Sequence, residues 1–139
     1  MTTNSLTKTI FLRADKTTVW DYLTDPEKLG IWFHKPKNTL TLGESFEMFG
    51  TESGDKLLWG TVTNARPHDL LEYTFTIPHM PDTISTVTWT LESVAGGTRL
   101  SLNHQGLPGT EDMFYLSLAL DSGWDGHFVR LRNELQPGD

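Results

Sequence analysis

Ser122–Leu135, with the sequence SGWDGHFVRLRNEL, is the stretch that decides the fold, because a helical pattern there carries two glycines and two large aromatics. At about 100° per residue, eight side chains fall within an arc of roughly 120°, the width of a core-facing stripe. They are Met113, Leu116, Leu120, Trp124, His127, Phe128, Leu131 and Leu135. Because glycine costs about 1 kcal/mol relative to alanine inside a helix, Gly123 and Gly126 indicate either close packing or a gap beside Trp124. The stretch predicts a long C-terminal helix, Asp112 to about Leu135, which needs a large surface to lie on.

Length and charge restrict the class of protein. The chain has 139 residues and a formal net charge of -7 at pH 7, so we expect one domain over residues 1–139 with a hydrophobic core of its own. An acidic surface repels phosphate backbones and anionic lipids, so neither nucleic acid nor a membrane is expected as a partner. There is no cysteine, no apolar run near the ~18 residues of a membrane span, and no signal-peptide pattern at the N-terminus. A cytoplasmic location is therefore predicted.

The patterns ahead of the C-terminal helix predict a sheet and two short helices. A strand is expected at residues 6–14, followed by helices that begin at Asp15 and at Asp25, with Pro26 in the first helical position. Period-two alternation then predicts strands at 39–42, 45–49, 56–65, 71–77 and 84–92, and a last strand that carries Leu100, Leu102 and His104. Consecutive strands flanked by helices are typical of an α+β domain. We expect a curved antiparallel sheet wrapped around the long C-terminal helix.

Four motifs resemble one superfamily. Residues 14–32 resemble its opening A-P-x-x-x-V-W-x-x-L-T-D-P…W, although Asp15 stands where the proline is usual. Residues 60–75 are similar to its middle strands, and Gly97-Thr-Arg-Leu-Ser-Leu-Asn-His104 resembles its strand G-T-R-L-T-L-T-H. Gly-Trp in residues 123–135, with the leucines that follow, resembles its helix G-W-x-x-x-L-x-x-L.

Together these motifs resemble the START-like (SRPBCC) superfamily. Within it they are most similar to the branch named after the activator of the ninety-kilodalton heat shock protein ATPase, specifically the C-terminal domain of that activator. The resemblance implies the helix-grip fold, also called START-like or Bet v-like. Members of the superfamily include lipid carriers, polyketide cyclases and natural-product resistance proteins, so the fold alone does not decide the function.

The candidate binding residues are the large side chains that the pattern turns toward the space between the sheet and the C-terminal helix. They are Trp32, Phe46, Met48, Trp59, Tyr73, Phe75, Trp89, His104, Leu120, Trp124 and Phe128. Rings like these fill cores, but they also line pockets for apolar ligands. Trp59 is ambiguous, because Leu58 and Val62 make the other face of its strand apolar as well. We expect a cavity that binds a small hydrophobic or aromatic molecule.

Three functional classes follow from these residues, and a binding protein is favoured. An enzyme of the polyketide cyclase or hydratase type would need His104 or His127 with Tyr73 as an acid/base pair, and no catalytic residue is assigned otherwise. The five histidines show no metal-ligand spacing, so neither a metal nor another cofactor is expected. A chaperone-interacting protein is disfavoured, because the eukaryotic activators resemble this chain only in their C-terminal domain. Neither the identity of the ligand nor the oligomeric state follows from the sequence.

Overall fold

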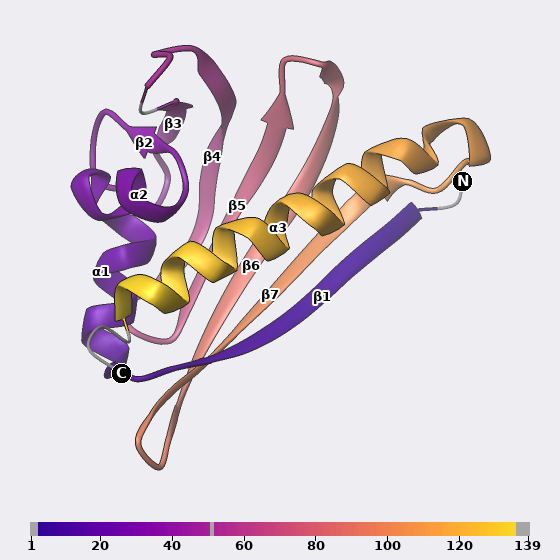
Figure 1. The fold of residues 1–139 in the computed structure, drawn as a ribbon. Helices are drawn as coiled ribbons and strands as arrows, with labels where there is room; N and C mark the ends of the chain where they lie inside the picture. The colour runs from indigo at the N-terminus through magenta and orange to yellow at the C-terminus, as the bar shows by residue number, and fades with distance from the viewer. Residues whose placement is uncertain (1–2, 51, 136–139) are drawn as a thin grey trace.

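A seven-stranded antiparallel sheet wraps around one long helix in the computed structural model, which describes residues 3–50 and 52–135 (Figure 1). The strands are β1 (Thr3–Leu12), β2 (Lys35–Pro36), β3 (Ser45–Phe49), β4 (Lys56–Arg66), β5 (Leu70–Ile77), β6 (Met80–Val94) and β7 (Gly97–Pro108). The helices are α1 (Lys16–Thr24), α2 (Pro26–Trp32), the 3₁₀ turn η1 (Glu111–Met113) and α3 (Phe114–Leu135). This arrangement confirms the α+β helix-grip fold.

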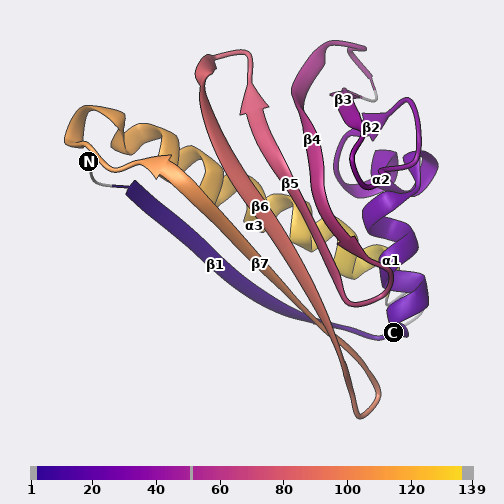
Figure 2. The same ribbon diagram turned by 180° about the vertical axis from the view of Figure 1, so that it is seen from behind.

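The two faces of the sheet lie in different surroundings. The order is β1-β7-β6-β5-β4-β3-β2, so that the first strand of the chain lies beside the last. α3 crosses one face of the sheet diagonally, and α1 and α2 lie at the end formed by β2 and β3 (Figure 1). The view from behind shows no helix of the described chain over the opposite face (Figure 2). We call the face under α3 the inner face and the opposite one the outer face.

Side-chain caps begin the two short helices, as the sequence predicts. The carboxylate of Asp15 accepts from the backbone N–H of Thr18 at 2.9 Å, and that of Asp25 accepts from Lys28 N–H at 3.1 Å. These bonds satisfy amides that the first turn of a helix leaves without a partner. At the end of α2, the indole Nε1 of Trp32 donates to the carbonyl oxygen of Tyr22 at 2.8 Å. The caps and this bond position Trp32 beneath α3.

The apolar stripe of α3 packs on the inner face, as its periodicity predicts. Leu116, Trp124, Phe128, Leu131 and Leu135 are buried, and Met113, Leu120 and His127 are half-buried. The α-helix itself begins at Phe114, because the preceding residues form η1 instead of a regular helical turn.

One charged residue on the inner face of β1 also holds α3. Lys8 interrupts the apolar alternation of the strand, and its Nζ lies 2.8 Å from carboxylate oxygens of both Asp121 and Asp125. Burial lowers the pKa of Lys8, but hydrogen bonds to the two carboxylates outweigh burial and raise the pKa overall. The two acidic residues lie one helical turn apart, so a single ammonium group can bind both. The edge strand is thereby tied to α3.

The strand predicted at residues 39–42 is not formed. Leu40 is buried, and its N–H donates to the carbonyl oxygen of Thr24 at 3.1 Å. Glu44 N–H donates to Thr41 O at 3.0 Å, and Gly43, with φ of 84°, donates to Val62 O at 2.9 Å. These bonds close a turn between α2 and β3, so alternation in this short segment reflects one buried leucine and not a strand.

β4 and β5 approach each other closely at Gly60. An ideal Cβ on Gly60 would lie 1.9 Å from the carbonyl oxygen of Thr74, well inside contact distance. Beside it, the N–H of Thr61 donates to the hydroxyl of Thr74 at 2.9 Å. Only glycine fits at this position without moving one of the strands.

We expect Gly60→Ala to lower the free energy of unfolding by more than about 2 kcal/mol, because the two strands must separate to admit the methyl group. Gly126→Ala on α3 is the matched control, since a Cβ there meets nothing within 4 Å. The control is expected to gain up to about 1 kcal/mol from helix propensity. Urea denaturation of both variants measures the difference, and equal stabilities would contradict the close approach at Gly60.

Candidate functional site

Aromatic rings fill most of the space between the sheet and α3. The ring of Trp89 on β6 lies with its centroid 5.5 Å from Trp124, 5.9 Å from Phe128 and 6.0 Å from Trp32. All three contacts are edge-to-face, the geometry that the quadrupoles of aromatic rings favour. Trp32 and Trp89 are at most 1% exposed. These side chains belong to the packed core. A cavity can therefore lie only next to them.

A chain of hydrogen bonds runs through this core from α3 to β5. The indole of Trp124 donates to Nδ1 of His104 at 3.1 Å. Because an indole only donates, Nδ1 accepts and the imidazole proton lies on Nε2. Nε2 then donates to the hydroxyl of Ser85 at 2.7 Å, and Ser85 donates to the carbonyl oxygen of Phe75 at 3.1 Å. Every polar side-chain atom in this series of hydrogen bonds has a partner.

These hydrogen bonds give His104 a structural role. Burial lowers the pKa of His104 to about 4, so its imidazole is neutral near pH 7. Both ring nitrogens are occupied within the core. Tyr73 is similarly placed, because its hydroxyl accepts from the indole of Trp89 at 3.1 Å and burial raises its pKa. His104 has no free ring nitrogen and Tyr73 is 2% exposed, which disfavours the pairing of these two residues as acid and base.

An open cavity of about 130 Å³ remains beside the ring cluster, between α3, the end of α2, and strands β4 and β5. Its walls are Phe33, His34, Leu57, Leu58, Phe75, Ile77, Leu120, Gly123, Trp124 and His127. A second cavity of about 10 Å³ shares three of these residues and continues toward Met80, Ser85 and Leu116. We call the larger one the inner cavity. It is the candidate functional site.

Gly123 opens the inner cavity on the helix side. A Cβ at Gly123 would meet nothing within 4 Å, so this glycine marks a gap and not close packing. Gly126 also has open space at its Cβ, but it does not line the cavity. Gly123 is itself exposed, so a larger side chain there would stand at the open rim of the cavity.

Two histidines form the polar part of the cavity wall. The rings of His34 and His127 meet edge to face, with centroids 5.0 Å apart. The pKa of each is lowered to about 4, mainly by burial; the charge of Arg130 contributes to the lowering at His34, and His34 and Arg130 contribute at His127. Arg130 Nη2 lies 2.6 Å from Nδ1 of His127, and a guanidinium group only donates. The same Nδ1 lies 3.1 Å from the carbonyl oxygen of Trp32, which only accepts. These two contacts occupy Nδ1, so Nε2 is the nitrogen that His127 can offer to a ligand.

The sequence prediction and the structure agree on three of the residues in this wall, namely Phe75, Leu120 and Trp124. The residues that lie in the surrounding core are Trp32, Met48, Tyr73, Trp89, His104 and Phe128, while Phe46 packs against Tyr73 with ring centroids 5.1 Å apart. Trp59 lies on the outer face, because the buried Leu58 beside it takes the inner position and successive side chains alternate along a strand.

Several wall residues have no distinct signal in the sequence. Phe33 and His34 follow α2, and Leu57 is the second residue of β4, so periodicity assigns none of them to a cavity. Gly123 does carry a signal, since a glycine inside a helix has a cost that some local feature must offset.

Two structural findings bear on other classes of site. Within residues 3–50 and 52–135, no group of three or more histidine, aspartate or glutamate side chains is close enough to hold a metal ion. None of the helices in the same ranges is long and apolar enough to cross a membrane.

Comparison with known proteins gives a family and several structural neighbours. Residues 13–136 match the family described as Activator of Hsp90 ATPase homolog 1-like protein. Protein MLL2253 from Mesorhizobium loti is 24% identical, with a TM-score of 0.85 over 98% of this chain and 99% of that chain. CalU16 from Micromonospora echinospora is 24% identical, with a TM-score of 0.77 over 97% of this chain and 78% of that one.

A further neighbour is the Aha1 dimer from Colwellia psychrerythraea, which is 18% identical, with a TM-score of 0.79 over 98% of both chains. At these identities the likeness of the structures shows the fold alone. None of the curated proteins matches the chain.

The burial of His104 predicts a specific loss of stability in acid. Its pKa is about 4 in the folded protein and about 6.5 when unfolded, so the unfolded state takes up the proton first as the pH falls. The stabilisation is complete above about pH 6.5 and falls by about 3 kcal/mol on the way to pH 4. We expect His104→Gln to flatten the dependence of the unfolding free energy on pH by this amount. The exposed His79→Gln serves as control, and a variant of His104 that keeps the wild-type slope would contradict the assignment.

Proposed function

The chain belongs to the family of Activator of Hsp90 ATPase homolog 1-like proteins, and we propose that it binds a small aromatic molecule in the inner cavity. The observation that carries this proposal is the open space of about 130 Å³ beneath Gly123, walled by aromatic rings on an otherwise close-packed face. The cavity is open, so a ligand can enter it, and a concave site lined by aromatic side chains with a few polar groups is typical of small-molecule binding.

The size and walls of the inner cavity favour one aromatic ring. An engineered apolar cavity of about 150 Å³ in another protein stays dry and takes up benzene, which sets the scale for this one. Phe33 and Trp124 lie nearly parallel, at 18° with centroids 5.2 Å apart, beside the edge of His127. Walls of this kind match a flat ligand whose faces and edges meet the rings in offset or edge-to-face contacts.

The two histidines favour a ligand that carries an oxygen atom. Both imidazoles are neutral near pH 7 because burial lowers their pKa values, so they provide hydrogen bonds without a charge. Nε2 of His127 can pair with a hydroxyl group on the ring of the ligand, because a hydroxyl both donates and accepts. We therefore propose a phenol-like molecule as the ligand class.

Binding is favoured over proton transfer by the position of the titratable groups. His104 and Tyr73, the acid/base candidates deepest in the fold, are occupied by hydrogen bonds within the core. The neutral His34 and His127 stand at the cavity wall, where a ligand can contact them. The chaperone-partner alternative makes no use of an inner cavity, so binding of a small molecule there distinguishes the two functions.

Filling the gap at Gly123 tests the proposal. With phenol as the probe, we expect Gly123→Leu to bind at least about tenfold more weakly than the wild type, because the new side chain occupies the space of the ligand. Gly126→Leu is the matched control, with the same substitution on the same helix at a site outside the cavity wall. Titration calorimetry measures both affinities. If phenol does not bind the wild type, or if both variants bind equally well, the proposal is wrong.

The hydrogen bond from His127 is tested by comparing phenol with benzene. We expect His127→Phe, which keeps a ring but removes Nε2, to weaken phenol binding by about threefold to tenfold and to leave benzene binding unchanged. His79→Phe on the surface controls for the loss of a histidine elsewhere. An equal loss for both probes would show that His127 acts through packing and not through a hydrogen bond.

A further inference from the structure

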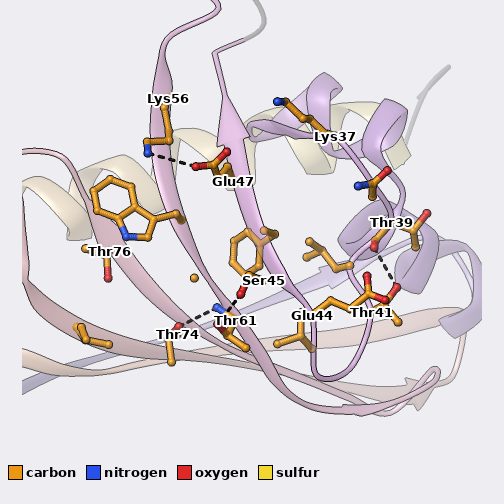
Figure 3. A pocket seen from close by; sticks show the side chains of 17 residues that line it. Lys37, Thr39, Thr41, Glu44, Ser45, Glu47, Lys56, Thr61, Thr74 and Thr76 are labelled. Carbon is orange, nitrogen blue, oxygen red and sulfur yellow. Dashed lines mark hydrogen bonds and ion pairs between the residues drawn. The ribbon is translucent and has the colours of Figure 1, made fainter.

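A second hollow, of about 550 Å³, lies along β3, β4 and β5 on the outer face, and it is separate from the inner cavity (Figure 3). We call it the outer pocket. Most of its strand residues alternate with the buried inner-face residues, although the buried Phe46 and Val62 also reach its lining. The segment 37–41 forms its side wall. Trp59, which the sequence analysis assigned to the inner face, is one of these residues.

Hydroxyl groups dominate the polar lining of the outer pocket. The residues that supply them are Thr39, Thr41, Ser45, Thr61, Thr74 and Thr76. The hydroxyls of Ser45 and Thr61 lie 3.3 Å apart, and the oxygen of Thr74 accepts from the backbone of Thr61 (Figure 3). A hydroxyl both donates and accepts, so this lining suits a ligand whose own groups do the same.

Thr76 is the hydroxyl that most clearly calls for a ligand. The residue is 4% exposed, yet its side chain makes no hydrogen bond to any residue that the structure describes. Since no buried polar side-chain atom of the described chain lacks a partner, the small exposed part of Thr76 includes its oxygen. Thr76 lines the outer pocket (Figure 3), and its oxygen has no partner among the described residues.

The charges around the outer pocket balance. Nζ of Lys56 lies 3.2 Å from the carboxylate of Glu47 and 4.7 Å from the ring centroid of Trp59 (Figure 3). The other two charged residues of the lining are Lys37 and Glu44, of opposite sign. Because two lysines and two glutamates balance, the lining favours neither an anion nor a cation.

We propose that the outer pocket binds a neutral ring bearing several hydroxyl groups, such as a pyranose sugar or a cyclic polyol. The apolar C–H face of such a ring can lie against Trp59, Phe46 and Leu40, which line the same pocket. Its hydroxyls can pair with the threonines, and Thr76 gains the partner it lacks. The volume falls within the roughly 300–1,000 Å³ of small-molecule sites. A purely apolar ligand would cover the hydroxyl of Thr76 without giving it a partner, which costs free energy.

Titration of the ¹⁵N-labelled full chain tests the proposal, with methyl β-D-glucopyranoside and myo-inositol as separate probes for the pyranose and the polyol. We expect either probe to shift the indole resonance of Trp59 and the amide resonances of Gly60 and Thr61. Thr76→Val keeps the shape of the side chain but removes its hydroxyl, and should weaken binding about threefold to tenfold. Thr90→Val is the matched control, because Thr90 is exposed on β6 outside the pocket.

The outcomes separate this proposal from the one for the inner cavity. Phenol should leave the Trp59 resonance unchanged, since the inner cavity lies on the other face. The proposal is overturned if neither hydroxylated probe shifts the three resonances, if phenol shifts them equally, or if Thr90→Val weakens binding as much as Thr76→Val. Unfolding curves of both valine variants establish that each is folded when its affinity is measured.

Discussion

The hydrogen bond from the indole of Trp124 to His104 joins α3 to the sheet, and the rest of the structure depends on it. Hydrophobic contacts press the helix onto the sheet but are not directional. The bond, at 3.1 Å, continues through Ser85 to the backbone of Phe75. It therefore fixes the height and rotation of the helix above three strands. Once Trp124 is held in this way, the missing side chain at Gly123 becomes an open cavity and not a space that the helix could close by rolling.

Alternation along two strands places two different chemistries back to back. On β4, Leu58 contributes to the inner cavity and Trp59 to the outer pocket. On β5, Phe75 faces inward, whereas Thr74 and Thr76 line the outer pocket. A slip of one residue in register would exchange the faces of every side chain. The close approach at Gly60, which only a glycine permits, holds β4 and β5 in the register that keeps the two sites apart.

Two glycines illustrate opposite uses of a missing side chain. At Gly60 the neighbouring backbone occupies the place of the Cβ, so the residue is required for the fold. At Gly123 nothing occupies that place, so alanine would strengthen the helix by about 1 kcal/mol. Gly123 lowers the stability of its helix and opens a cavity. These two properties fit a role in binding, because binding sites commonly keep features that are unfavourable for stability.

The sequence by itself determined the elements and their order. The caps at Asp15 and Asp25, the apolar stripe of α3 and the alternation of the central strands are local patterns, and the backbone periods of 3.6 and 2 convert them directly into buried faces. The tertiary structure alone decided where space remains between those faces. Whether Trp89 and His104 line a cavity or fill a core depends on rings from distant elements that meet there, and no local pattern records this packing. Trp59 and the turn at residues 39–42 show the same limit: one apolar side chain in a short segment is compatible with either face, and only the partners across the sheet select one.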